Sequence, residues 1–448
     1  MHKPTLHSVF LHLALLGLVF SGPVPARAND LLDVFRQAQA RDPQLEIQAQ
    51  QRAAQIESRP QARAALLPQL AVTAERAHER LGPEDPAPTG DSSQVGVGIT
   101  QTLWNLEAFQ RLRASGFDVA EAEARFEAAR QGLLLRVAEA YFHVLSAADQ
   151  LATNRAAREA FGGLLNQARV REETGIGPRS AVLQAESFYD ATLQPVIDAG
   201  NNYEDALRAL AAISGSYRDV LAALRDDAAL PPATPSPADD WLARARSTNP
   251  GLLASASHVE SAEHLLSAEQ ASGMPTLSAR GSLASLREDA ALGPDSDQRR
   301  IALSLTWPLF QGGAVASRTR EARARYRQAQ AEYEQALRDV ERQLRRSYVG
   351  SQRGSERIEA GRRLVASTQA AIEAARNNVE FGTGSEFELL NAQNLHFVAL
   401  SSYHQARFDY LLDTLRLQQL AGELGERDLL RIDALLVDGS ARGAANVP

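Results

Sequence analysis

Four short segments of the chain alternate apolar and polar residues, two in each half. Val95, Val97 and Ile99 lie on one face of a predicted strand, with glycine and threonine between them, and Ile301 and Leu303 alternate with small polar residues. Leu277, Ala279 and Leu283 alternate in the same way, and Leu70, Val72 and Ala74 do so less cleanly. Such alternation over about ten residues is typical of a membrane-spanning β-strand, with one face towards lipid. A half-buried strand of a soluble sandwich fits the strands alone equally well.

Proline-free stretches predict very long helices beside these strands. Residues 106–171 and 314–381 contain no proline, and at about 1.5 Å per residue each helix would span roughly 100 Å. Both end at glycine-rich turns, and return helices follow at 180–214 and 385–421, the first interrupted by Pro195. Because no globular domain needs such lengths, each half is predicted to form a long antiparallel helical hairpin.

A shorter helix precedes the strands in each half, at 31–64 and at about 239–271, and Pro68 and Pro275 stop these helices. The order of elements is thus the same in both halves. Pro43 and Pro250 are 207 positions apart, and the same offset joins Pro68 to Pro275, Gly175 to Gly382, Gly177 to Gly384 and Gly215 to Gly422. A repeat of this length predicts a duplicated half-protein rather than a solenoid.

The start of the chain predicts export. A short basic start, an apolar run and the segment Ala26-Arg27-Ala28 form the pattern of a cleaved signal peptide. No apolar run of about 18 residues follows, so the sequence predicts no transmembrane helix after cleavage. The patterns together divide the chain into a signal peptide 1–28, a first repeat 29–215, a connecting equatorial segment 216–238, a second repeat 239–422 and a C-terminal equatorial segment and tail 423–448.

The amino-acid composition excludes several kinds of chemical site and partner. The absence of cysteine excludes disulfides, cysteine-based metal sites and an acylated N-terminal cysteine. A net charge of −8 argues against a nucleic-acid partner. His258 and His264 are six positions apart, so one helical face does not present both to a metal, and no Gly-x-Ser-x-Gly motif occurs. The sequence therefore predicts no enzyme, no cofactor and no metal site.

Four strands cannot close a barrel, because known outer-membrane barrels need about eight or more. An open sheet in lipid would leave costly unpaired edges, so strands that span a membrane require oligomerisation here. Two copies would give a barrel filled by its own side chains, whereas three copies give twelve strands and a usable lumen. The predicted fold class is mainly α, with long helical hairpins below a trimeric twelve-stranded membrane β-barrel.

Several segments resemble one known family. These are Phe381-Gly382-Thr383-Gly384, Leu390-Asn391-Ala392-Gln393, Ala406-Arg407-Phe408-Asp409-Tyr410, Leu67-Pro68 and Asn249-Pro250. Over essentially all of the chain after the signal peptide, the sequence resembles the TolC-like outer-membrane efflux and secretion channels. The resemblance implies a homotrimer in the outer membrane lipid with a periplasmic helical tunnel. It also implies docking of the helical tips onto a periplasmic adaptor protein and an inner-membrane transporter, either ABC-type or proton-driven.

The tips offer candidate docking residues. Gly175, Gly177, Gly382 and Gly384 occupy equivalent turns in the two repeats, and we expect their neighbours Ile176, Arg179, Thr383 and Glu386 to be exposed for docking. Arg179 and Glu386 are equivalent positions of opposite charge and could form a salt bridge at the tip. The alternative is that these residues only close helices.

A gate is expected one turn further. Glu388 and Asn391 lie on one helical face, and by resemblance family members can carry carboxylates at both positions. Here only Glu388 is acidic, and the first repeat offers Ala181 and Gln184 instead. A trimer would present one ring of three glutamates, which would select and bind cations. The alternative is a solvated glutamate that favours the helix dipole.

Two rival functions remain at this point. A periplasmic coiled-coil adaptor or scaffold without a pore explains the helices but not the four alternating strands. An outer-membrane hydrolase lacks a nucleophile and a base. Within the channel class, the sequence does not separate drug efflux from protein secretion, because cargo choice lies with the transporter.

Overall fold

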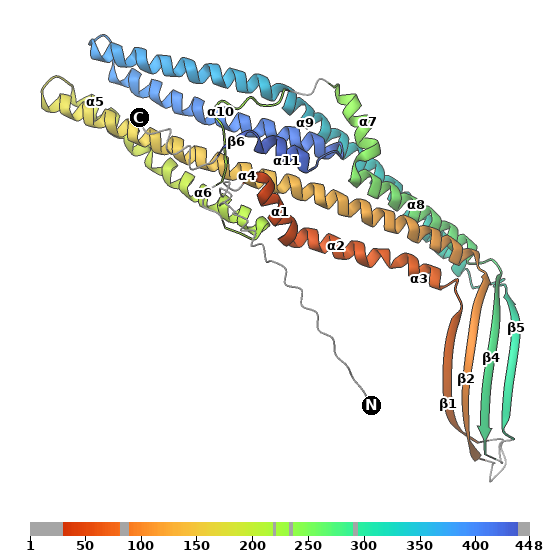
Figure 1. Cartoon of the computed structure of the whole chain (residues 1–448). Coiled ribbons are helices and arrows are strands. Elements are labelled where there is room, and N and C mark those ends of the chain that lie inside the picture. Colours follow the sequence, from red (N-terminus) through yellow and green to blue (C-terminus); the bar gives the residue numbers. More distant parts are fainter. Residues whose placement is uncertain (1–29, 81–88, 218–220, 233–235, 290–293, 438–448) are drawn as a thin grey trace, which may run out of the picture.

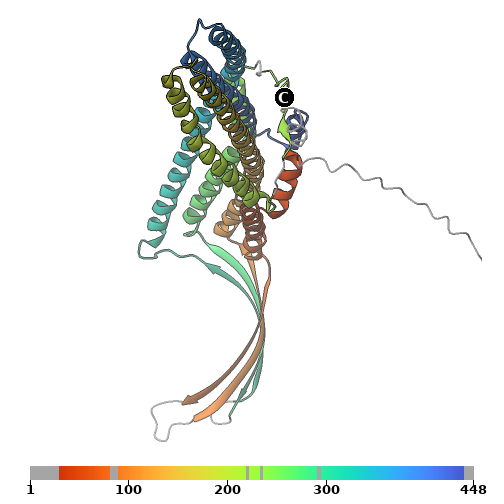
Figure 2. The same cartoon turned by 90° about the vertical axis from the view of Figure 1, so that its left-hand side faces the viewer.

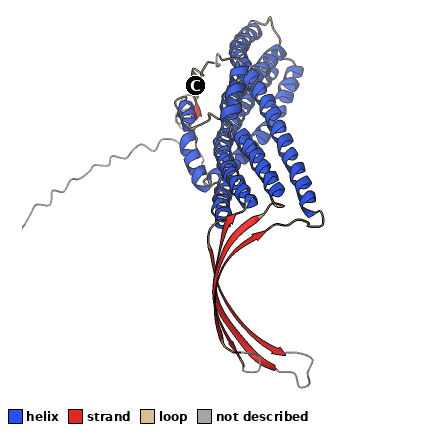
Figure 3. Cartoon of the chain, turned by 90° about the vertical axis from the view of Figure 1, so that its right-hand side faces the viewer, coloured by secondary structure: helices blue, strands red, loops and turns tan. Residues whose placement is uncertain are grey.

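The chain is an elongated molecule in the computed structural model, with a curved sheet at one end and helical hairpins reaching to the other (Figures 1 and 3). The structure describes residues 30–80, 89–217, 221–232, 236–289 and 294–437. The expected signal peptide, 1–28, lies outside these described residues. Within them, no helix has the length and apolar character that crossing a membrane requires.

Two very long helices organise the molecule, as predicted. Helix α4 (Leu106–Glu173) packs against most other helices, and α9 (Ala314–Glu380) runs beside α8 and then α10. The chain returns from α4 as α5 (Arg179–Ala191) and α6 (Leu193–Ser214), and from α9 as the single helix α10 (Glu386–Leu420). The expected interruption lies between α5 and α6, at Thr192. It follows from Pro195, which has no N–H to bond the carbonyl of Ala191.

The shorter helices are broken where one continuous helix was expected. Residues 31–64 form three helices: α1 (Leu31–Arg41), α2 (Pro43–Ile56) and α3 (Ser58–Ala64). The residue before a proline is driven out of the helical region, and Asp42 is extended, with ψ at 116°. Its carboxylate then accepts a 2.7 Å hydrogen bond from the N–H of Leu45 and caps α2.

The second repeat breaks at the equivalent place. Helices α7 (Ala238–Thr248) and α8 (Pro250–Ala271) meet at Asn249, whose side chain accepts a 3.0 Å bond from the N–H of Leu252. The Asn249 amide also donates to the Leu420 carbonyl at 2.8 Å, so the break docks on the end of α10. The expectation of one helix over 239–271 was therefore wrong, and the Asx-Pro pair is the cause in both repeats.

The four strands form one antiparallel sheet in the order β1-β2-β4-β5 (Figure 2). They are β1 (Gln69–Arg80), β2 (Thr89–Trp104), β4 (Thr276–Glu288) and β5 (Ser296–Thr306). Leu70 pairs with Ile99, Ile99 with Gly281 and Gly281 with Ile301, so these residues form one row across the sheet. Directly paired residues face the same side, and the alternation therefore gathers the apolar side chains on one face.

The main core lies midway along α4, where the first and last described helices meet it. Tyr141 and Phe142 of α4 are fully buried against α1, α6, α10 and α11 (Glu426–Asp433). The Tyr141 hydroxyl donates to the carbonyl of Ala222 at 2.7 Å, beside the small pair β3 (Ala223–Leu224) and β6 (Leu436–Val437). This core fixes the hairpins relative to one another.

Candidate functional site

The sheet exposes its apolar face. Ile301 is 95% exposed, Leu303 73% and Val72 70%, although these are the residues that a core would bury. In a soluble sandwich a second sheet would cover this face, but nothing in the described part of the chain does so. A continuous exposed apolar surface of this kind marks contact with a membrane or a partner. The sheet therefore fits the membrane-strand interpretation and not the sandwich.

Aromatic residues border the apolar face where the strands meet the helices. Trp104 and Trp307 are more than half exposed, and Phe310 is 87% exposed. Large amphipathic aromatic rings gather at the interface between lipid and water in membrane barrels. This belt of aromatic residues was not predicted from the sequence, although two of the three tryptophans in the chain stand at strand ends.

The two helical tips close in the same way. Gly175 and Gly382 have φ of +76° and +72°, a left-handed conformation that favours glycine. At the first tip the amides of Ile176 and Gly177 both donate to the Arg171 carbonyl at 2.9 Å. At the second, Thr383 and Gly384 donate equivalently to Asn378, at 2.8 and 3.0 Å.

The second glycine of each tip is needed for a different reason. A Cβ on Gly177 would lie 2.9 Å from the Cβ of Arg171, and one on Gly384 would lie 2.7 Å from the Cβ of Asn378. These glycines therefore let the chain pass close to the helix it has just left. Close to these glycines, the side chains of Ile176, Arg179 and Thr383 are exposed, as docking residues would have to be.

The tip salt bridge is not the one that the repeat suggested. Glu386 pairs with Arg171 at 2.9 Å, and Arg179 has no ion pair among the described residues. Glu386 sits in the first turn of α10, which packs along α9 and also against α4, so its side chain can meet the last turn of α4. Side-chain contacts between the two hairpins determine which residues form the ion pair. Matching the positions of the two repeats does not reveal those contacts.

Glu388 and Asn391 are both exposed, on one face of α10. Ser385 caps this helix by accepting a 3.2 Å hydrogen bond from the backbone amide of Glu388. The carboxylate of Glu388 makes no ion pair in the described structure. In the first repeat Ala181 is buried and Gln184 is exposed. The two hairpins thus present different surfaces at equivalent positions, and only α10 offers an acid.

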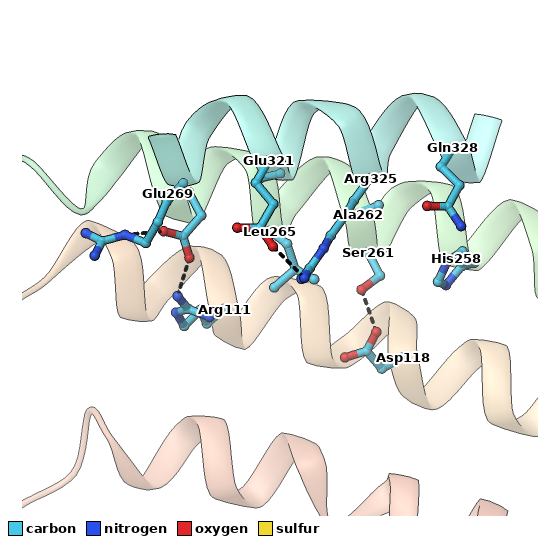
Figure 4. A pocket seen from close by; sticks show the side chains of 12 residues that line it. Arg111, Asp118, His258, Ser261, Ala262, Leu265, Glu269, Glu321, Arg325 and Gln328 are labelled. Carbon is cyan, nitrogen blue, oxygen red and sulfur yellow. Dashed lines mark hydrogen bonds and ion pairs between the residues drawn. The ribbon is translucent and has the colours of Figure 1, made fainter. Parts of the chain in front are cut away.

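A charged cleft of about 510 Å³ lies between α4, α8 and α9, close to the sheet (Figure 4). Glu269 of α8 stands at one end of the cleft, 2.6 Å from Arg111 of α4 and 3.1 Å from Arg318 of α9. The carboxylate therefore joins three helices directly below the strands. Within the described residues no group of His, Cys, Asp or Glu is arranged to hold a metal ion.

A second carboxylate connects the first and last described helices. Asp433 of α11 accepts hydrogen bonds from the amides of Leu31 and Leu32, at 2.9 and 3.1 Å, and so caps α1. Burial raises the pKa of Asp433 to about 6, and the nearby charge of Asp30 adds to the rise. No local pattern predicts this contact, because about 400 positions separate its partners.

Comparisons with known proteins agree with this geometry. The model of the family described as outer membrane efflux protein matches residues 34–216 and 241–423, two segments offset by the same 207 positions as the repeat. Outer membrane protein TolC of Vibrio cholerae is 30% identical over 91% of this chain and 94% of its own. The alkaline protease secretion protein AprF of Pseudomonas aeruginosa is 28% identical over 92% of this chain and 89% of its own.

A solved structure of CusC, described together with its transmembrane channel formation, superimposes with a TM-score of 0.80. It covers 88% of this chain and 92% of its own at 18% identity, and so supports the fold alone. The family model matches most of the chain in both repeats. The chain therefore belongs to the outer membrane efflux protein family.

Proposed function

We propose that this chain is one protomer of a trimeric outer-membrane channel that passively conducts exported cargo. Its strands would form a twelve-stranded barrel, and its hairpins a periplasmic tunnel. The observation that carries the proposal is the exposed apolar face of a sheet whose edge strands, β1 and β5, each pair on one side only among the described residues. Unpaired edges are costly in lipid, and pairing β5 of one copy with β1 of the next removes them.

The proposal extends to the tips. The exposed Ile176, Arg179 and Thr383, with the half-buried pair of Glu386 and Arg171 behind them, would dock a periplasmic adaptor that connects to an inner-membrane transporter. Glu388 would form a ring of three carboxylates at the narrow end, with Asn391 one turn further in. Because AprF is named for protease secretion and the family for efflux, both type I secreted proteins and small toxic compounds are candidate cargo.

A pair of neighbouring substitutions tests whether the apolar face meets lipid. Ile301→Asp places a charge on that face, and Ala302→Asp places the same charge on the opposite face. A charge facing lipid near the middle of a barrel strand is destabilising, so Ile301→Asp should insert into the outer membrane much less than Ala302→Asp. Membrane fractionation provides the measurement. Normal insertion of Ile301→Asp would contradict the proposal.

A further inference from the structure

The polar face of the sheet carries two arginines without partners. Arg280 of β4 and Arg300 of β5 are exposed, and among the described residues neither makes a hydrogen bond or an ion pair. Arg280 pairs with Ala302 and Arg300 with Ser282, so the two are diagonal neighbours on adjacent strands. Diagonal positions lie roughly 7 to 8 Å apart, close enough for the two guanidinium groups to act on one ion.

These arginines lie at the level of the most apolar part of the opposite face. Their rows flank the row that joins Ile99, Gly281 and Ile301. Their side chains project from the polar face, where the guanidinium groups would be hydrated inside a water-filled barrel. The same register that turns Ile301 to lipid therefore turns Arg300 to the lumen.

Acidic side chains of the polar face lie elsewhere. Glu75 pairs with Gln94 and Glu288 with Ser92, closer to the end of the strands away from the helices. On the polar face one row lies between Arg300 and Glu75, and its residues Thr73, Gly96, Ala284 and Gln298 carry no charge. The arginines thus form a separate positive level in the strand-built part of the molecule.

We propose that Arg280 and Arg300 form a band of guanidinium groups that lines the barrel lumen and selects for anionic groups on ions and cargo. The proposal rests on the trimeric channel proposed above, in which three copies supply six guanidiniums at one level. Twelve strands about 4.8 Å apart and tilted about 40° enclose a backbone diameter of roughly 24 Å. Arginine side chains narrow this opening further, so an ion on the axis passes within about one Debye length of the charges at 0.1 M salt. The band has the opposite sign to the glutamate ring proposed at the periplasmic end.

Planar-bilayer recordings of the complete protein test the band. The ratio of chloride to potassium permeability is compared between wild type and the double variant Arg280→Gln/Arg300→Gln, with trimer formation checked for each. One charge about 10 Å from an ion changes its local concentration roughly twofold in water, so the double variant should lower the ratio at least about twofold. Inorganic tripolyphosphate added on the barrel side should block wild type and should block the double variant more weakly.

Two matched variants serve as controls for the double variant. Arg299→Gln removes a charge from the lipid-facing side, one position away, and should leave the ratio unchanged. Glu75→Gln removes a negative charge from the polar face and should raise the ratio. An unchanged ratio and unchanged block in the double variant would overturn the band, as would an equal effect of Arg299→Gln. Wild type that forms no channel would overturn the proposed function itself, and the band with it.

Discussion

Arg171 and Glu386 join the two helical hairpins at their tips, with Nη1 and Oε1 2.9 Å apart. Both side chains are less than one-third exposed, so the pair is less screened than a surface ion pair. The bond links the last turn of α4 to the first turn of α10, and therefore ties the two repeats together where the tunnel would narrow.

Breaking this pair should loosen the tip. Glu386→Gln removes an interaction of about 1 kcal/mol, or roughly a fivefold shift per protomer from the closed to the loosened tip. Single-channel recording should show a higher open probability. Arg179→Gln changes an equally cationic tip residue that has no ion pair in the described structure, and should leave gating unchanged. The exchange Arg171→Glu/Glu386→Arg should restore closure, and failure to do so would remove the pair from the gate.

Adding one methyl group at the second tip should impair export. Gly384→Ala places a Cβ 2.7 Å from the Cβ of Asn378, so the turn must shift, at a cost of about 1 to 3 kcal/mol. Cargo export should fall while the trimer still assembles. Gly163→Ala is the matched control, because a Cβ there meets nothing within 4 Å and alanine favours the helix. Normal export by Gly384→Ala would count against a docking role for the tip.

The contact between Asp433 and α1 should depend on pH. The pKa of this carboxyl rises from 3.8 to about 6 on folding, so the folded chain holds the proton more tightly than the unfolded chain. The resulting stabilisation is complete below about pH 4 and is lost as the pH rises through about 6. Thermal denaturation in detergent should show wild type gaining stability between pH 7 and pH 5 relative to Asp433→Asn. Identical pH dependence in the two proteins would contradict this assignment.

The carboxylate of Glu388 should control cations at the periplasmic end. Glu388→Gln should weaken the block by a trivalent cation added from that end, and Asn391→Asp should strengthen it by adding a second acidic ring. Gln393→Glu makes the same charge change on the opposite face of α10 and should have little effect. Planar-bilayer recording measures the block. If Glu388→Gln is blocked as strongly as wild type, Glu388 is a solvated helix-start residue and no gate.

Local patterns predicted the elements whose cause is local. The alternation at Val95, Val97 and Ile99 located β2, and the absence of proline located α4 and α9. The breaks at Asp42 and Asn249 were missed although their signal, an Asx-Pro pair, was present in both repeats. Helix propensity was given more weight there than the conformational restriction that proline imposes on its predecessor.

Contacts between distant segments were not accessible in the same way. The partner of Glu386 depends on how α10 packs against α4, and the repeat suggested Arg179 instead of Arg171. The cap that Asp433 provides for α1 has no sequence signature, because it joins opposite ends of the chain. The gate role of Glu388 and the docking role of the tips stay predictions, because a single protomer does not contain the surfaces that would face them.

The mass of the purified complex in detergent tests the account most directly. Four strands with two open edges per protomer predict a particle of three chains, since three copies give the smallest closed barrel with a lumen. Light scattering with the detergent contribution subtracted should give three times the protomer mass, and the same particles should conduct ions in a planar bilayer. A stable monomer or dimer that inserts into membranes and conducts would contradict the twelve-stranded barrel.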